Sequence, residues 1–268
     1  MMDKRIISLS PATTEIICAL GLQDQLVGRS EDCSPMDAVH HLPICASLSV
    51  DAKLIQELNP TILFVDSRHA AELRQLDINA ISLQFGTLSD VYTNISIIGQ
   101  ALNEEKKAEE LIENSKERVD IILHKLKYSE IKPKVACFTS LSPLAIGNTL
   151  LSELIEIAGG SNPLTTNVAS TGVGLAEFKL EDPQIMVIMP ENYAIQRTLQ
   201  EFNQLLNIPG WSDLSAVTNN QVYIADSQNV FSSQGMRLFD GLEILAEIIH
   251  PKQFVFGYQG TGWIKFNS

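Results

Sequence analysis

The stretch that decides the fold is Asn103–Lys127, which reads NEEKKAEELIENSKERVDIILHKLK without a glycine or a proline. Apolar residues recur in it at helical spacing, for example Ala108, Leu111 and Ile122. Asn103 is the expected N-cap, acidic residues crowd the first turns and lysines the last, and this order suits the helix dipole. Such a helix is about 35 Å long, which is enough to cross a whole domain.

Strand-like apolar segments alternate with short helices on both sides of this helix. The expected strands are Arg5–Leu9, Leu26–Arg29, a short one around Ile44, Thr61–Val65, Ala80–Leu83, Lys134–Thr139, Leu144–Ile146, Ile185–Met189 and Gln221–Ala225. The expected helices are Ala12–Leu20, Asp51–Leu58, Arg68–Leu76, Leu88–Leu102, Thr149–Ala158, Glu177–Glu181, Ile195–Phe202 and Gly235–Ile249.

The two halves repeat one order of elements, because Asn59-Pro60 and Asp182-Pro183 each end a helix just before an apolar strand. The sequence therefore predicts an α/β fold with two Rossmann-like lobes, residues 1–102 and 128–268. We expect the helix 103–127 to join them as one long rigid strut, with a ligand cleft between the lobes. The alternative that the pattern leaves open is a surface helix on a single α/β domain.

The composition excludes several functional classes. A hydrophobic fraction of 45% over 268 residues is ample for a core, so a disordered chain is excluded. A net charge of −13 argues against nucleic acid and anionic membrane surfaces as partners. The apolar runs are too short to span a bilayer. Four residues of soft-ligand type lie in one loop region, but their spacing fits no zinc site, so we predict no metal ligand set. They are Cys33, His40, His41 and Cys45.

The first residues, MMDKRIISLSP, contain no secretory h-region. If this N-terminus is native, the sequence predicts a cytoplasmic protein. The other interpretation is an exported protein whose signal peptide has been removed.

Several segments carry a resemblance to a known family: Arg5–Glu15, Ala19–Leu22, Leu26–Gly28, Asn59–Val65, Glu156–Gly160, Pro209–Trp211, Arg237–Glu243 and His250-Pro251. Together they resemble the helical-backbone (class III) substrate-binding proteins of ABC transporters, which bind cobalamin, ferric siderophores or haem, and they are nearest the cobalamin-binding branch. The resemblance implies a monomer without a covalent cofactor, a ligand held between two lobes, an ABC permease as partner, and a place in the periplasm or at the cell surface.

The chain departs from this family in two places. Cobalamin binders of the class carry a tryptophan after the strand that ends here at Val65, and this chain has Asp66 instead. The class docks on its transporter through one surface glutamate on each lobe. The first falls at Lys53, where the charge is reversed, and the second at Glu177. A lysine that faces a transporter arginine would repel it.

The first strand–helix turn is the first candidate ligand site, because ligands bind at the carboxyl edge of parallel strands. Its residues are Ser10, Pro11, Ala12 and Thr13, and a purely structural turn is the alternative. Cys33 follows the second strand, where its thiol could meet a metal centre or be an ordinary loop cysteine.

Charged residues follow the strand Thr61–Val65, namely Asp66, Arg68 and His69. Arg68 and His69 could pair with an anionic ligand group such as a propionate or a phosphate. Solvated charges at a helix start are the alternative.

In the second lobe, Ser140 and Thr171 lie in the corresponding loops. Tyr193 could stack on a planar ligand, bind iron through its phenolate, or pack on the lobe. Phe231 and Arg237 lead into the closing helix, where the family often carries arginines. The tail Phe254–Phe266 is expected to pack back on a lobe.

No P-loop, G-x-S-x-G, H-E-x-x-H or G-x-G-x-x-G motif after a strand occurs, so no enzymatic activity is predicted. The leading hypothesis is a substrate-binding protein of an ABC-type uptake system for a metal chelate. The alternative is a cytoplasmic carrier or enzyme that handles a corrinoid or tetrapyrrole without a transporter. A third possibility is an interaction domain without a small ligand.

Overall fold

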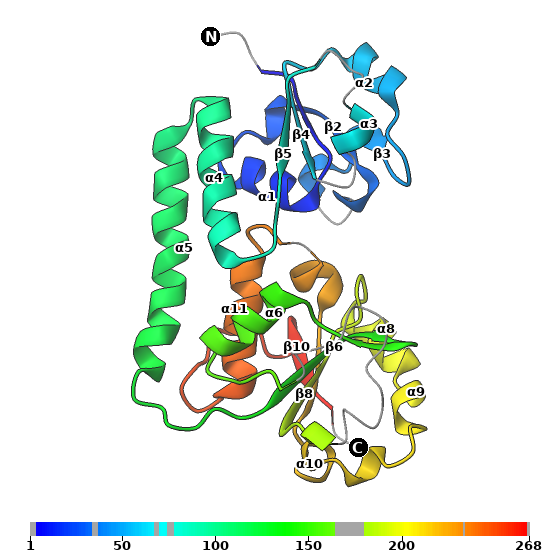
Figure 1. Ribbon diagram of the computed structural model, residues 1–268, viewed down its shortest axis with the longest axis vertical. Helices are drawn as coiled ribbons and strands as arrows, with labels where there is room; N and C mark the ends of the chain where they lie inside the picture. Colours follow the sequence, from blue (N-terminus) through cyan, green and yellow to red (C-terminus); the bar gives the residue numbers. More distant parts are fainter. Residues whose placement is uncertain are drawn as a thin grey trace. The chain divides into compact units, whose positions relative to one another are not determined.

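The computed structural model describes residues 4–33, 37–66, 70–73, 78–163, 180–232 and 234–266 (Figure 1). The chain divides into two compact units. Unit 1 comprises Met1–Lys116 and Ser233–Met236, and unit 2 comprises Glu117–Ser232 and Arg237–Ser268. Each unit contains one sheet and its own helices, so the predicted α/β fold class with two lobes is confirmed.

Unit 1 is built on a parallel five-stranded sheet in the order β3-β2-β1-β4-β5. Its elements are β1 (Ile6–Ser8), α1 (Pro11–Ala19), β2 (Leu26–Ser30), β3 (Ile44–Ala46), α2 (Ala52–Leu58), β4 (Ile62–Asp66), α3 (Ala70–Leu73), β5 (Ala80–Leu83), α4 (Leu88–Leu102) and the first part of α5 (Glu105–Leu126). Figure 1 shows α1 and α4 on one side of the strands and α2 and α3 on the other. Ile7, Leu63 and Val65 pack with residues of α2 and α3 to form the core on that second face.

Unit 2 is built on a mixed five-stranded sheet in the order β10-β9-β8-β6-β7, in which β7 and β10 run antiparallel to their neighbours. Its elements, besides the rest of α5, are β6 (Val135–Leu141), β7 (Leu144–Ile146), α6 (Thr149–Ile157), β8 (Ile185–Ile188), α8 (Ile195–Glu201), α9 (Asn203–Leu206), α10 (Ser215–Thr218), β9 (Val222–Ala225), α11 (Leu238–Ile249) and β10 (Trp263–Lys265). A π-helical turn, Ser227–Phe231, lies between β9 and α11. Every residue of α11 except Asp240 is buried, because the helix is apolar almost all round.

Most of the predicted elements are confirmed to within one or two residues, including the long helix α5. The prediction that Asn103 is its N-cap is wrong. Asn103 ends α4 instead, in a left-handed conformation (φ 58°), which asparagine tolerates well. The chain then turns directly into α5, and a Cβ on Gly99 would clash with the Cβ of Ala108, so α4 and α5 pack closely at this glycine.

Two further predictions need correction at the C-terminal end. The closing helix begins at Leu238, not at Gly235, because residues 234–237 form bends and a turn before it. The tail does pack back, but it also supplies a strand, β10, which the sequence pattern did not indicate. Most of the predicted helix Glu177–Glu181 lies outside the described residues.

Candidate ligand-binding site

The turn between β1 and α1 is present as predicted, but it is largely buried. Ser10, Ala12 and Thr13 are at most 5% exposed, and only Pro11, at the first helical position, is half-buried. The Ser10 hydroxyl makes no capping hydrogen bond within the described part of the chain. The backbone N–H groups of Ala12 and Thr13 are therefore left for other partners, since Pro11 has no N–H and the N–H of Thr14 donates to Ser10 O.

The Thr13 hydroxyl is an exception to the rule that buried polar groups are paired. Thr13 is fully buried, and its Oγ1 finds no hydrogen-bond partner among the described residues. Burying a hydroxyl without a hydrogen-bond partner destabilises the folded protein. The Thr13 hydroxyl is therefore a candidate for a hydrogen bond to a bound ligand.

The neighbouring Thr14 belongs to a hydroxyl and thiol network instead. Thr14 Oγ1 donates to Ser8 Oγ at 2.8 Å and also lies 3.2 Å from Cys33 Sγ. Ser30 Oγ lies 3.2 Å from the same sulfur. This network ties α1 to the ends of β1 and β2. The network was not predicted from the sequence, although serines and threonines at two neighbouring strand ends were a usable signal.

Cys33 is fully buried, and burial raises the pKa of its thiol, while hydrogen bonds from Ser30 and Thr14 act in the opposite direction. A protonated thiol is a poor metal ligand. A ligand could reach Cys33 only by displacing the hydroxyl network around it, so contact of Cys33 with a ligand stays a prediction.

Arg29 in β2 holds the loop that follows this strand. Its side chain is buried, and it donates to the carbonyl oxygens of Val39 (3.0 Å), Ser30 (3.0 Å) and His40 (3.1 Å). Three backbone acceptors thus surround one guanidinium, whose planar fork suits such an arrangement.

Among the other predicted residues of unit 1, Asp66 ends β4 and is half-buried. Arg68 and His69, and likewise Thr171 and Glu177 of the second lobe, lie outside the described residues. Lys53, at the position expected for docking, lies in α2 and is exposed, and its Nζ is 3.7 Å from Glu57.

Tyr193 follows β8 and has two partners on α8. The guanidinium carbon of Arg197 lies 3.7 Å from the centre of its ring, and its hydroxyl donates to Glu201 Oε2 at 3.0 Å. One face of the ring is therefore covered by a cation. A planar ligand could stack on the other face, and iron could bind the phenolate only if Glu201 gave up its hydrogen bond.

The other predicted residues of unit 2 lie at three separate points. Ser140 is half-buried in β6, where it pairs with Ala145 of β7. Phe231 ends the π-helical turn. Arg237 precedes α11, and its Nη1 donates to Asn229 O at 2.9 Å. Ligand contact by each of them stays a prediction.

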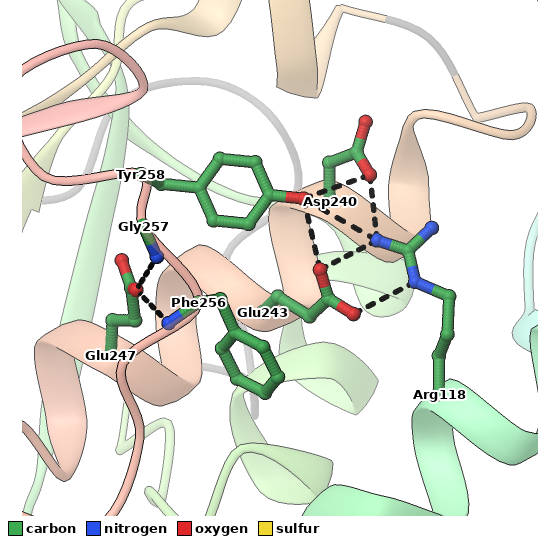
Figure 2. Close-up of polar contacts among 7 residues, drawn as sticks. All are labelled: Arg118, Asp240, Glu243, Glu247, Phe256, Gly257 and Tyr258. Carbon is green, nitrogen blue, oxygen red and sulfur yellow. Dashed lines mark hydrogen bonds and ion pairs between the residues drawn. The ribbon is translucent and has the colours of Figure 1, made fainter.

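A charged cluster that the sequence analysis missed fixes α5 to α11 (Figure 2). Arg118 binds Glu243 through two hydrogen bonds of 2.8 and 2.6 Å and Asp240 through one of 2.6 Å. Tyr258 donates its hydroxyl toward Glu243 Oε2 at 2.9 Å. Burial alone would lower the pKa of Arg118, but the hydrogen bonds to both carboxylates outweigh it, so the pKa is raised and the guanidinium stays charged.

A second carboxylate on α11, Glu247, is 3% exposed and binds N–H groups only, within the described residues (Figure 2). Its Oε1 accepts from the backbone of Phe256 and, at 2.6 Å, of Gly257. Its Oε2 accepts from Trp263 Nε1 at 2.7 Å. Glu247 thereby fastens the C-terminal tail to α11.

Within the described residues, no group of three or more His, Cys, Asp or Glu side chains is arranged to hold a metal ion. His40 and His41 are exposed, whereas Cys33 and Cys45 are buried. In the same part of the chain, no helix is both long enough and apolar enough to cross a bilayer.

Comparison with known proteins agrees with this architecture. The chain is 28% identical to an uncharacterized ABC transporter substrate-binding lipoprotein, YvrC, of Bacillus subtilis, over 94% of this chain and 81% of the relative. It is 26% identical to a vitamin B12-binding protein of Vibrio parahaemolyticus, over 84% and 82% of the two chains. The fold is similar to that of a periplasmic heme binding protein from Pseudomonas aeruginosa, with a TM-score of 0.79 at 22% identity over 93% and 94% of the two chains.

The family model for periplasmic binding proteins matches residues 6–229, which is most of the chain. The matched range includes the first strand, both sheets up to β9 and the whole of α5. The chain belongs to the family of periplasmic binding proteins.

Proposed function

We propose that this protein is the substrate-binding component of an ABC-type uptake system and that its ligand is a metal chelate: cobalamin, a ferric siderophore or haem. The observation that carries the proposal is the family match over residues 6–229. The relatives support it, because one is named as an ABC transporter substrate-binding lipoprotein and another as a vitamin B12-binding protein. The cytoplasmic carrier that the sequence left open has no such support.

The role is binding without chemical conversion. The residues that we propose for it are the first turn of α1 in unit 1 and the residues around Tyr193, Phe231 and Arg237 in unit 2. Thr13 is the first of these, because a fully buried hydroxyl without a partner in the described chain is available to a ligand. Arg237 and Arg197 supply positive charge for an acidic group of the chelate.

The partner in this proposal is an ABC permease, and the location is the periplasm or the outer face of the cell. Docking through Glu177 stays a prediction. Lys53 is 87% exposed by side chain, so this position offers a cation where the resemblance implies a glutamate. The Lys53 side chain would not attract a transporter arginine, because both are positively charged.

The ligand class can be tested by thermal unfolding of the full chain with cyanocobalamin, hemin and a ferric siderophore. We expect one of them to raise the melting temperature by several degrees at 100 times its Kd, since binding to the folded state alone adds about 2.7 kcal/mol there. The matched controls are the same chelators without metal. No shift with any of the three would contradict the proposal.

The two neighbouring threonines offer a matched pair of variants for the site. Thr13→Val removes a hydroxyl that has no partner in the described chain, so the unliganded protein should keep its stability within about 0.5 kcal/mol. If Thr13 meets the ligand, the same change weakens binding roughly tenfold in calorimetry. Thr14→Val breaks the network with Ser8 and Cys33 and should lower stability by about 1–2 kcal/mol. Unchanged affinity in Thr13→Val would remove Thr13 from the site.

A further inference from the structure

Unit 1 contains two thiols of unequal exposure, Cys18 and Cys33. All four cysteines of the chain are free. Cys18 lies in α1, and Cys33 ends the single 3₁₀ turn Glu31–Cys33 that follows β2. Cys18 is partly exposed, whereas Cys33 is fully buried. A reagent in solution can therefore reach Cys18 directly, but not Cys33.

The two thiols have a neighbour in common, Thr14. Its Oγ1 lies 3.2 Å from Cys33 Sγ, and the 3₁₀ turn that carries Cys33 packs against α1. Cys18 follows Thr14 by four residues in the same helix, so the two side chains lie on one helix face, with about 5–6 Å between their Cβ atoms. The Cys33 thiol thus lies against α1, about one helical turn from Cys18.

The ionisation of Cys18 agrees with this placement. Burial raises the pKa of the Cys18 thiol, and the nearby Cys33 raises it further, because two thiolates at short range repel each other. The two sulfurs are therefore close enough for one to affect the charge of the other.

The other two cysteines lie elsewhere in the fold. Cys45 belongs to the core on the face of the sheet that carries α2 and α3, whereas α1 lies on the opposite face (Figure 1). Cys137 is buried in β6, which belongs to unit 2. Within unit 1, Cys33 is thus the thiol on the same side of the sheet as Cys18.

We propose that Cys18 and Cys33 are a redox pair that forms a reversible disulfide bond, with Cys18 reacting first because it is the exposed thiol. With a small disulfide such as oxidised glutathione, the Cys18 thiolate attacks one sulfur and displaces a glutathione thiolate. Cys33 then attacks the Cys18 sulfur and displaces the second one. Two cysteine thiols are oxidised, one glutathione disulfide is reduced, and the two cysteine protons end on two glutathione molecules.

The bond would tie α1 to the loop that follows β2. A disulfide needs its two Cβ atoms about 4 Å apart, so Cys33 must leave its hydroxyl partners on Thr14 and Ser30 when the bond forms. The proposal goes beyond the proposed function and does not depend on it, because the disulfide can be measured without any ligand.

Oxidation of the full chain with glutathione disulfide tests the pair. Burial raises the pKa of both thiols, so the reaction is run at about pH 9, where more thiolate is present. Free thiols are then blocked with N-ethylmaleimide, and non-reduced tryptic peptides are read by mass spectrometry. The peptide 6–29, which contains Cys18, should be linked to the peptide 30–53, which contains Cys33 and Cys45. Dithiothreitol should abolish the link.

Two variants identify the partner of Cys18. Cys33→Ser should lose the link and stop at a mixed disulfide between glutathione and Cys18. Cys45→Ser is the matched control, because it makes the same change in the same tryptic peptide, and it should form the link as the unaltered chain does.

A measurement on the unaltered chain covers the case in which Cys33→Ser does not fold. A protease that cuts at aspartate separates Cys33 from Cys45 at Asp37, so the linked cysteine is identified without any substitution. A link from Cys18 to Cys45, a stable mixed disulfide on Cys18 in the unaltered chain, or thiols that stay free throughout the oxidation would each overturn the proposal.

Discussion

The two sheets match in four strand positions and differ at opposite edges. β1, β2, β4 and β5 occupy the same relative places as β6, β7, β8 and β9, whereas β3 and β10 are edge strands without a counterpart among the described strands of the other sheet. Each of these two edges is secured by one buried ionised side chain that binds backbone. Arg29 holds the loop that leads to β3, and Glu247 holds the tail that leads to β10.

The opposite signs of the two charges follow from the backbone that each must satisfy. The loop before β3 presents the carbonyl oxygens of Val39 and His40, which need a donor. The tail before β10 presents the N–H groups of Phe256 and Gly257, which need an acceptor. Irregular backbone cannot be buried unless its polar groups are paired. In both sheets the added edge strand thus depends on a side chain whose charge matches the unpaired backbone groups beside it.

The largest loss of stability is expected when the C-terminal tail loses its anchor, Glu247. Glu247→Ala removes the acceptor of two partly buried backbone N–H groups and of the buried indole N–H of Trp263, so the free energy of unfolding of unit 2 should fall by about 3–4 kcal/mol. The two tryptophans of the chain, Trp211 and Trp263, both belong to unit 2, so urea unfolding followed by their fluorescence reports this unit alone.

The control for this change is Glu156→Ala, which removes the same side chain from an exposed position on α6 of unit 2. It should shift the fluorescence transition by less than about 0.5 kcal/mol. Equal shifts in the two variants would contradict the role of Glu247 as an anchor.

An intermediate effect is expected at the other edge. Arg29→Lys keeps the charge but loses the planar fork that reaches three carbonyl oxygens, and should destabilise unit 1 by about 1–2 kcal/mol. The fluorescence transition of unit 2 should stay in place, while hydrogen exchange in β2 and β3 speeds up. A fluorescence shift as large as that of Glu247→Ala would break the comparison, because the two anchors would then not be specific to their own units.

The smallest change in stability is expected in the cluster of Arg118, Asp240, Glu243 and Tyr258. This cluster is less buried than Arg29 or Glu247. Burial raises the pKa of Tyr258, and the hydrogen bond to Glu243 adds to this. A phenol whose pKa is raised in the folded state contributes stability below its unfolded pKa of about 10, and this contribution is lost as the pH rises through the folded value. As the pH rises from 9 to 11, the free energy of unfolding should therefore fall by about 0.5–1 kcal/mol less in Tyr258→Phe than in the unaltered chain. This range is reduced for the partial exposure of Tyr258 to solvent.

Ultraviolet titration of the phenols gives an independent measurement. Burial also raises the pKa of Tyr223, so Tyr223 and Tyr258 should both ionise late in the unaltered chain. In Tyr258→Phe the late fraction should fall by one phenol. If the late fraction did not change, Tyr258 would not be held by the two carboxylates.

Much of this protein could be predicted from its amino-acid sequence. Periodicity located α5 and nearly every strand, because the period of apolar residues is set locally by helix and strand geometry. Proline and glycine marked the element ends. The quoted segments were enough to indicate the family of periplasmic binding proteins, which the match over residues 6–229 shows.

Tertiary structure decided the rest. Asn103 could cap either of two helices, and only the close contact of Gly99 with Ala108 selects the end of α4. Whether Thr13 or Thr14 finds a partner depends on where β1 and β2 end in space, not on either residue. The anchors Arg29 and Glu247 bind backbone groups of other segments of the chain. Such contacts are long-range pairings of polar groups and close approaches of backbone, which leave no periodic signal in a sequence, because they exist only once the chain has been brought together.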